Sequence, residues 1–362
     1  MTTNIQNFAP TTATAACGKL PSTVDELLET GLLNQWYLVC PSGELGEKPL
    51  SLTRLNQQIA LWRDAQGQAH AVEDFCPHRG ARMSMGHVVS GGLACAYHGL
   101  TLDGAGVVTA VPPVHECPLT GQRAVRAYPV REAAGAIYLY FSDGTSDVVP
   151  EFILPPQLLS EEWSGFLHCW EWDSHYTLPL ENRLDPMHAP YLHAQTFTLA
   201  YGVKQSLIQL HETEHGFVIE RDNQRGVNID RTELTWIPGN NLWIQTSIPY
   251  PKCVGGNSFS IISHITPIDA RRTYMWVYRW QKSQGWQRDL WRFLYKNRLE
   301  KRHLHVLDQD RVLIEAIPEG TRQREVLIQC DVGIARMRRM LRQEAQRQID
   351  ARGQAQPLTV RK

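Results

Sequence analysis

Long apolar runs and net charge are both scarce in this 362-residue sequence. No uninterrupted apolar stretch approaches the roughly 20 residues that a membrane-spanning helix needs. The 36 basic and 37 acidic side chains give a formal charge of −1, so the overall field does not attract nucleic acid or an anionic membrane. Met1 to Lys19 is rich in Thr and Ala and lacks the basic start and apolar core of a secretory signal. These absences predict a cytoplasmic protein that binds neither membranes nor nucleic acid, with a disordered N-terminal tail.

Dense cysteine spacing is missing as well. Disulfide-stapled secreted domains place their cysteines close together in short chains. The eight cysteines of this sequence are instead spread out, at Cys17, Cys40, Cys76, Cys95, Cys117, Cys169, Cys253 and Cys330. A reducing compartment therefore fits best. We expect six of them to be buried or inert thiols, whereas Cys76 and Cys95 each stand beside a histidine.

Local patterns predict an α+β protein of two domains. Ser22 or Thr23 can cap a short helix, and short β-like runs separated by turn signals then continue to about Ser142, which indicates a small all-β domain. After Pro150, helical stretches alternate with strand candidates, which favours an antiparallel sheet covered by helices. The expected strands are 36–40, 59–63, 69–73 and 136–141, then 217–221, 242–248, 259–265 and 273–280, and the expected main helices are 178–193, 287–315 and 332–351. The predicted segments are 1–35 (tail and short helix), 36–150 (β domain), 151–352 (second domain) and 353–362 (tail).

Two short segments contain a cluster-binding pattern. Cys76 and His78 form Cys-x-His, and after sixteen residues Cys95 and His98 form Cys-x-x-His. Two thiolates and two imidazoles on tight loops are what a Rieske [2Fe–2S] centre requires, one iron taking the cysteines and the other the histidines. The pattern resembles the Rieske family, and the resemblance extends to Pro77, Arg79, Gly80, Tyr97 and Gly99. The alternative is a zinc-stabilised binding module, although zinc fingers usually pair Cys with Cys and His with His.

A second constellation reads Asn-x-x-Asp-x-x-His-x-x-x-x-His, from Asn182 to His193. Non-haem Fe(II) oxygenases bind iron through two histidines and one carboxylate and keep positions open for O2. On a regular helix His188 and His193 would lie roughly 140° apart around the axis. We therefore expect Pro190 to break or bend the helix between them, so that both rings reach one metal.

Asp185 lies three residues before His188 and on the same face of the expected helix. It can accept a hydrogen bond from the ring nitrogen of His188 that does not bind iron. Asn182 lies one turn further back on that face. Any one of these residues alone would be an ordinary surface or core residue, but the set following a Rieske motif predicts catalytic roles for Asp185 and Asn182.

This second string resembles that of the Rieske oxygenases, in which an aspartate near the end of the catalytic domain is the third iron ligand. Residues 309–316 look like that segment. One helical face is shared by Val306, Leu307, Asp310, Leu313 and Ile314. Asp310 would thus be an inward-facing acid, whose burial is costly unless a metal compensates it. Asp310 is the expected ligand, and Asp308 and Glu315 are its competitors.

The resemblance spans roughly residues 36 to 350, and within the family the vanillate and dicamba O-demethylase branch is most similar. It implies the oxygenase component of a multicomponent enzyme. Electrons from NADH or NADPH would pass through a reductase, such as one with flavin and a ferredoxin-type iron–sulfur cluster, to the [2Fe–2S] cluster and the mononuclear Fe(II), where O2 oxygenates a small organic substrate. It also implies a head-to-tail homotrimer, in which His98 of one subunit contacts Asp185 of the next.

Substrate chemistry is not encoded in any single run of residues. The candidate pocket residues are Phe197, Tyr201, Trp243, Thr246 and His264. We expect monooxygenation of an aromatic or related compound, by demethylation or hydroxylation. The alternative is cis-dihydroxylation of an aromatic ring, which uses the same iron ligands. A Rieske electron carrier would need only the first half of the chain, and a membrane-bound chlorophyll-pathway oxygenase would usually add a hydrophobic anchor.

Overall fold

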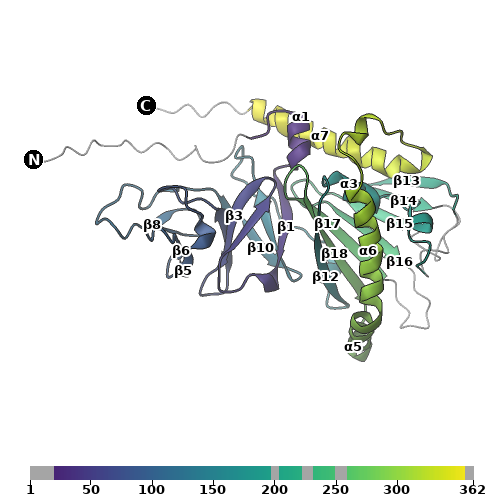
Figure 1. Ribbon diagram of the computed structural model, residues 1–362, viewed down its shortest axis with the longest axis horizontal. Coiled ribbons are helices and arrows are strands. Elements are labelled where there is room, and N and C mark those ends of the chain that lie inside the picture. Colours follow the sequence, from purple (N-terminus) through teal and green to yellow (C-terminus); the bar gives the residue numbers. More distant parts are fainter. Residues whose placement is uncertain (1–19, 197–203, 222–230, 249–258, 355–362) are drawn as a thin grey trace, which may run out of the picture. The chain divides into compact units, whose positions relative to one another are not determined.

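The computed structural model describes residues 20–196, 204–221, 231–248 and 259–354 (Figure 1). The described chain forms two compact units. The first is built around Val39–Asp143, and the second combines Ser22–Leu38 with the chain from Gly144 onwards. The predicted short helix, which we had grouped with the N-terminal tail, therefore belongs to the second unit.

The first unit is all β, as predicted. Its strands form three small sheets with the orders β1-β11-β10, β2-β3-β4-β9 and β5-β6-β7-β8, and β1 belongs to this unit from Val39 onwards. The elements are β1 (Gln35–Pro41), η1 (Ser42–Glu44), β2 (Leu50–Arg54), β3 (Gln57–Arg63), β4 (Ala69–Glu73), η2 (Met83–Met85), β5 (His87–Val89), β6 (Gly92–Ala94), β7 (Thr101–Leu102), β8 (Val108–Ala110), β9 (Ala127–Tyr128), β10 (Val130–Ala133) and β11 (Ala136–Phe141).

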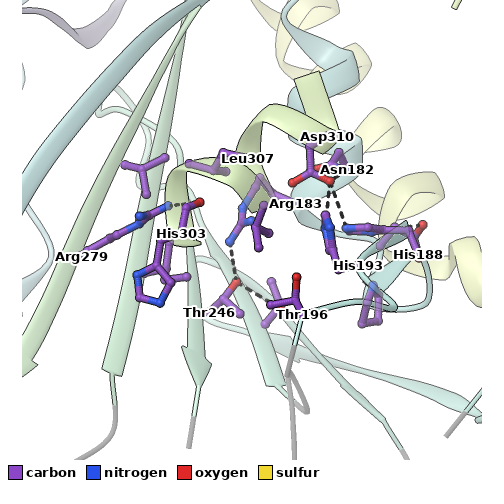
Figure 2. Close-up of a pocket in the computed structure, with 16 residues that line it drawn as sticks. Asn182, Arg183, His188, His193, Thr196, Thr246, Arg279, His303, Leu307 and Asp310 are labelled. Atoms are coloured by element: carbon purple, nitrogen blue, oxygen red, sulfur yellow. Dashed lines mark hydrogen bonds and ion pairs between the residues drawn. The ribbon is translucent and has the colours of Figure 1, made fainter. Parts of the chain in front are cut away.

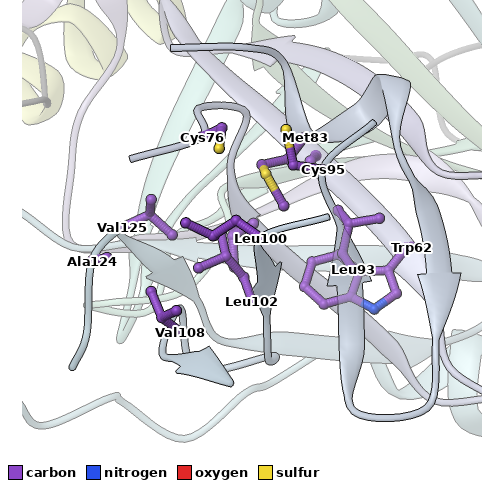
Figure 3. Packing of buried hydrophobic residues seen from close by; sticks show 12 residues of the cluster. Trp62, Cys76, Met83, Leu93, Cys95, Leu100, Leu102, Val108, Ala124 and Val125 are labelled. Carbon is purple, nitrogen blue, oxygen red and sulfur yellow. The ribbon is translucent and has the colours of Figure 1, made fainter. Parts of the chain in front are cut away.

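A buried apolar cluster ties two of these sheets to the cysteine loops. Trp62 of β3 and Leu93 of β6 pack in the same cluster as Cys76 and Cys95, and all four are nearly or fully buried (Figure 3). Removing this apolar surface from water stabilises the unit and at the same time holds both thiols at the edge of its core. The core therefore positions the cysteines.

The second unit contains a seven-stranded antiparallel sheet of order β12-β18-β17-β16-β15-β14-β13. Its strands are β12 (Trp163–Trp172), β13 (Ile208–Thr213), β14 (Gly216–Arg221), β15 (Arg231–Thr235), β16 (Trp243–Ile248), β17 (Phe259–Pro267) and β18 (Thr273–Lys282). The helices are α1 (Val24–Thr30), α2 (Pro156–Leu159), α3 (Thr177–Arg183), α4 (Ala189–Leu192), α5 (Gly285–Leu294), the π-helical turn η4 (Tyr295–Leu299), α6 (Glu300–Glu315), the 3₁₀ turns η5 (Thr321–Gln323) and η6 (Gln329–Asp331), and α7 (Val332–Gln354). The predicted α+β class is confirmed. The sequence patterns did not predict β12, β13 or β15.

Helices cover this sheet, with α3 and α6 running side by side along it (Figure 1). Thr23, one of the two predicted caps, caps α1, and Glu26 completes a capping box with it. α7 buries Ile334, Met337 and Leu341, the face that its apolar spacing indicates. No helix within the described ranges combines the length and apolar character required to cross a bilayer.

The predicted helix over 178–193 is interrupted in a different place from the one we expected. α3 ends at Arg183, residues 184–188 are non-helical, and α4 begins at Ala189. Pro190 lies in the first turn of α4, where the missing N–H costs no hydrogen bond. The break therefore precedes His188 and does not fall between the two histidines, which corrects the expected role of Pro190.

Candidate metal centres

Two loops of the first unit share one backbone geometry. The N–H of Gly80 donates to the carbonyl of Cys76 at 2.8 Å, and the N–H of Gly99 donates to that of Cys95 at 2.9 Å. Gly80 has φ +76° and Gly99 has φ +73°. A Cβ on Gly80 would lie 3.2 Å from a ring carbon of Phe75, and a Cβ on Gly99 would lie 3.2 Å from a ring carbon of Pro112. Only glycine fits here without strain, which explains why each Cys–His segment ends in one.

The four predicted cluster ligands lie at the tips of these loops. Cys76 and Cys95 are each 2% exposed, and the His78 and His98 ring centroids are 4.7 Å apart. Burial, with a further contribution from Cys95, raises the pKa of the Cys76 thiol to about 11. The buried Nδ1 of His98 has no hydrogen-bond partner within the described part of the chain. Paired thiols and an unpartnered imidazole nitrogen fit a [2Fe–2S] group, whose positive irons favour the thiolate form.

A second group of ligands meets in the second unit. Asp310 comes from α6, and His188 and His193 flank α4. His188 Nε2 lies 3.4 Å and His193 Nε2 3.1 Å from Asp310 Oδ1, so one ligand atom of each residue falls within 4.8 Å of the others (Figure 2). Two imidazoles and one carboxylate with an open side are the donor set of a mononuclear Fe(II) site.

Hydrogen bonds orient these side chains. The Nδ1–H of His193 donates to Gln309 Oε1 at 2.9 Å, which leaves the Nε2 lone pair directed at Asp310. The side-chain N–H of Asn182 donates to Asp310 Oδ1 at 3.2 Å. Asp310 is 1% exposed, whereas its competitor Asp308 is exposed and pairs with Arg311, as Glu315 does. A buried acid whose neighbours are two imidazoles fits a cation better than an empty site.

Asp185 lies beside His188, although not on a helix and at a longer distance than the predicted hydrogen bond requires. Its Oδ2 lies 3.6 Å from His188 Nδ1, across the non-helical turn, and its Oδ1 accepts the N–H of Met187 at 2.7 Å. Burial would raise the pKa of Asp185, but His188 and these backbone N–H groups outweigh it and hold the pKa below its usual value. Burial alone would lower the pKa of His188, but Asp185 and Asp310 raise it above its ordinary value. Asp185 is thus an anion beside the ring, on the side away from Asp310.

A pocket opens beside the three ligands, with an empty volume of about 720 Å³, part of which is open to solvent. Its lining includes apolar side chains, among them Ile261, Val306 and Leu307, and a polar set around Arg183 and Thr246 (Figure 2). An apolar wall with a few convergent polar groups is the composition typical of small-molecule pockets.

The predicted substrate residues divide by strand face. Thr246 lines the pocket, on the same face of the sheet as Ile261, its partner in register. Trp243 and His264 are absent from the lining, because successive side chains of a strand point to opposite faces. Phe197 and Tyr201 lie outside the described residues. On α6, Val306 lines the pocket, but Leu313, which we placed on the inward face, is 52% exposed.

Several polar residues of this site were not predicted, among them Gln309 and Arg183. Gln309 falls within the predicted segment 309–316 and Arg183 within the Asn182–His193 string, but neither was expected to take part in the site. Both directly adjoin a predicted residue, and this adjacency is the one signal that the sequence offers. Neither follows from helical periodicity, since neighbours on a helix point about 100° apart.

Comparison with known proteins gives the same division of the chain. The sequence profile of the Rieske [2Fe-2S] domain matches residues 35–129, and that of the vanillate O-demethylase oxygenase C-terminal domain matches residues 172–347. The chain is 34% identical over 171 residues to the vanillate O-demethylase oxygenase subunit of Pseudomonas sp. strain HR199, which covers 45% of each protein. It is 35% identical over 171 residues to the dicamba O-demethylase oxygenase component of Stenotrophomonas maltophilia, which covers 45% of this chain and 48% of that one.

These matches therefore span less than half the length of each curated relative. Over a longer span, the fold is similar to that of dicamba monooxygenase bound to dicamba, with a TM-score of 0.68 at 22% identity, covering 88% of this chain and 98% of that one. The two profiles, the two metal-ligand patterns and the shared fold agree, and the chain belongs to the Rieske oxygenase alpha-subunit family, in its vanillate and dicamba O-demethylase-like branch.

Proposed function

We propose that this protein is the oxygenase component of a multicomponent Rieske monooxygenase that demethylates or hydroxylates a small organic compound. The observation that supports this most is the convergence of His188, His193 and Asp310 beside a largely apolar pocket, in a chain that also has a Rieske domain. The vanillate and dicamba relatives are both named as O-demethylases, which favours demethylation over ring dihydroxylation.

Each ligand set has a distinct task in this proposal. Cys76, His78, Cys95 and His98 would hold the [2Fe–2S] cluster, and His188, His193 and Asp310 would hold the mononuclear iron. When bound, the cluster supplies electrons one at a time and the mononuclear iron activates O2. Gln309 and Asn182 orient two of the iron ligands.

The side chains of the pocket position the substrate. Its apolar lining takes an organic body out of water, which holds the reacting carbon near the iron ligands and keeps bulk solvent from the reaction. Thr246 is one of the polar groups that can fix its orientation.

The proposal includes partners that the family implies. A reductase would draw electrons from NADH or NADPH in the cytoplasm. In a homotrimer, the partner subunit's cluster would face the mononuclear iron, with Asp185 bonded to His188 on one side and to an incoming His98 on the other. Asp185 can contact a second subunit because its side chain is 27% exposed, although its Oδ2 lies near His188.

The test is product analysis under labelled oxygen. The purified protein, with a reductase and NADH, would be given methoxylated and plain aromatic acids under ¹⁸O2. Release of formaldehyde or incorporation of one labelled atom supports monooxygenation, and two labelled atoms in a cis-diol identify the dihydroxylating alternative. A colourless preparation fully loaded with zinc would contradict both.

A further inference from the structure

The pocket contains a cation that the proposed chemistry does not use. Arg183, at the end of α3, lines the pocket, and in Figure 2 it lies between the iron ligands and the pair formed by Arg279 and His303. Among the described residues, its guanidinium makes one hydrogen bond, a long one from Nη2 to Thr246 Oγ1 at 3.4 Å, and its buried Nε has no partner there. No carboxylate among the described residues forms an ion pair with it.

Arg279 is a useful contrast, because its guanidinium is already engaged. It donates from Nη1 to the hydroxyl of Tyr295 at 2.9 Å and from Nη2 to the carbonyl of His303 at 3.1 Å. Those bonds hold Arg279 against the helix layer as part of the framework. Arg183 has no comparable network within the described part of the chain, so its fork of N–H donors remains available to a ligand in the pocket.

The charges of the pocket leave Arg183 uncompensated. Of the two acids in the lining, Asp310 is directed at His188 and His193, and Asp185 at the other side of His188. A divalent iron bound by His188, His193 and Asp310 would add further positive charge. Burial lowers the pKa of Arg183, with Asp310 opposing this change and Arg279 adding to it. A guanidinium stays charged even so, and burying it without a counterion is costly.

We propose that Arg183 binds a carboxylate of the organic substrate, so that the enzyme selects small organic acids. The planar carboxylate matches the guanidinium fork, and Thr246 offers a hydroxyl beside it. The apolar remainder of the acid would then lie against Ile261, Val306 and Leu307. This inference rests on the proposed function only in taking this cavity as the substrate pocket.

The test compares an acid with its uncharged analogue at equilibrium, without turnover. Calorimetric titration of the anaerobic, metal-loaded protein would use 4-methoxybenzoate, benzoate and 4-methoxybenzamide as probes. Wild type should bind 4-methoxybenzoate at least roughly tenfold more tightly than the amide, as expected for a charge-assisted contact in a buried site. Arg183→Gln should abolish this preference, and Arg183→Lys should keep part of it because the charge remains.

A matched control removes the same charge outside the pocket. Arg302 is exposed on α6, so Arg302→Gln should preserve the preference for the acid. Folding of Arg183→Gln is checked by its cluster absorbance and its iron content.

The inference is overturned if wild type prefers the amide, if neither benzoate binds at millimolar concentration, or if folded Arg183→Gln retains the full preference for the acid. The two proposals can fail separately. If the protein prefers the acid through Arg183 but transfers no oxygen, the role of Arg183 stands and the proposed function is wrong.

Discussion

The two candidate metal centres are built by different means. The cluster ligands come from two loops within Cys76–His98, closed by short backbone hydrogen bonds, and His78 is exposed. The mononuclear ligands come from α6 and the segment around α4, far apart in the chain, and Asp310 is 1% exposed. One site depends on loop geometry and the other on the packing of helices against a sheet.

This difference predicts that the sites fail independently. Loss of a ligand in the second unit should leave the cysteine loops intact, because their hydrogen bonds are all local. Conversely, a substitution that strains one of the cysteine loops should leave the iron ligands of the second unit in place. The variants below separate the two sites, beginning with the largest expected effect.

The largest effect is expected from the iron ligands. Replacing His188, His193 or Asp310 by Ala should weaken iron binding more than about 100-fold, beyond the loss typical of a residue that only orients a ligand, and abolish turnover. The visible spectrum of the cluster should not change. Iron per subunit and absorbance measure this, with Asp308→Ala as the control. Full iron content in Asp310→Ala, together with its loss in Asp308→Ala, would show that the third ligand is misassigned.

Asp185→Asn should spare both metals and interrupt electron transfer between subunits. The amide keeps the size and one acceptor but loses the charge that, in the proposed trimer, would hold His188 and the partner subunit's His98. With substrate and O2 present, reoxidation of the chemically reduced cluster should slow by at least about 100-fold, because the link to His188 is weakened. Stopped-flow absorbance gives the rate, and light scattering gives the oligomer. An intact oligomer that reoxidises at the wild-type rate would exclude Asp185 from the electron route.

His98→Cys should change the electronic character of the first site without emptying it. A thiolate donates more charge to iron than an imidazole does, so the reduction potential should fall on the order of 100 mV. Potentiometric titration followed by EPR measures this, and His87→Cys, on an exposed strand residue of the same unit, is the control. An unchanged potential would exclude His98 as a ligand.

The smallest effect concerns the loop backbone. Gly99→Ala should destabilise the first unit by about 1–2 kcal/mol, because φ is positive there and the new Cβ meets Pro112. Urea unfolding measures this. Gly121→Ala, also at positive φ but with no atom within 4 Å of its Cβ, carries the strain without the contact. Cluster content should fall only in Gly99→Ala, and equal content in the two variants would show that the contact is unimportant.

Local sequence patterns predict much of the chain's organisation. The capping box at Thr23, the β texture of the first unit and the buried face of α7 follow from nearest-neighbour chemistry. The strands β12, β13 and β15 were missed for different reasons. β13 and β15 contain few apolar residues, although the burial of β15 does alternate. β12 is mostly half-buried along its length. Pro190 was misjudged because a proline ends a helix in its interior and is tolerated in its first turn.

By itself, the sequence determined the ligand types, their spacing within each loop, and the family to which the chain belongs. These are local properties, since a Cys-x-His segment closed by a glycine has few alternative conformations. Only the tertiary structure decided that Asp310 meets His188 and His193, that Thr246 enters the pocket while Trp243 and His264 do not, and that Arg183 forms no ion pair with any carboxylate of the described residues. Those outcomes depend on strand register and on how α3 and α6 pack over the sheet, and contacts between distant segments follow from the sum of many weak interactions that no short pattern records.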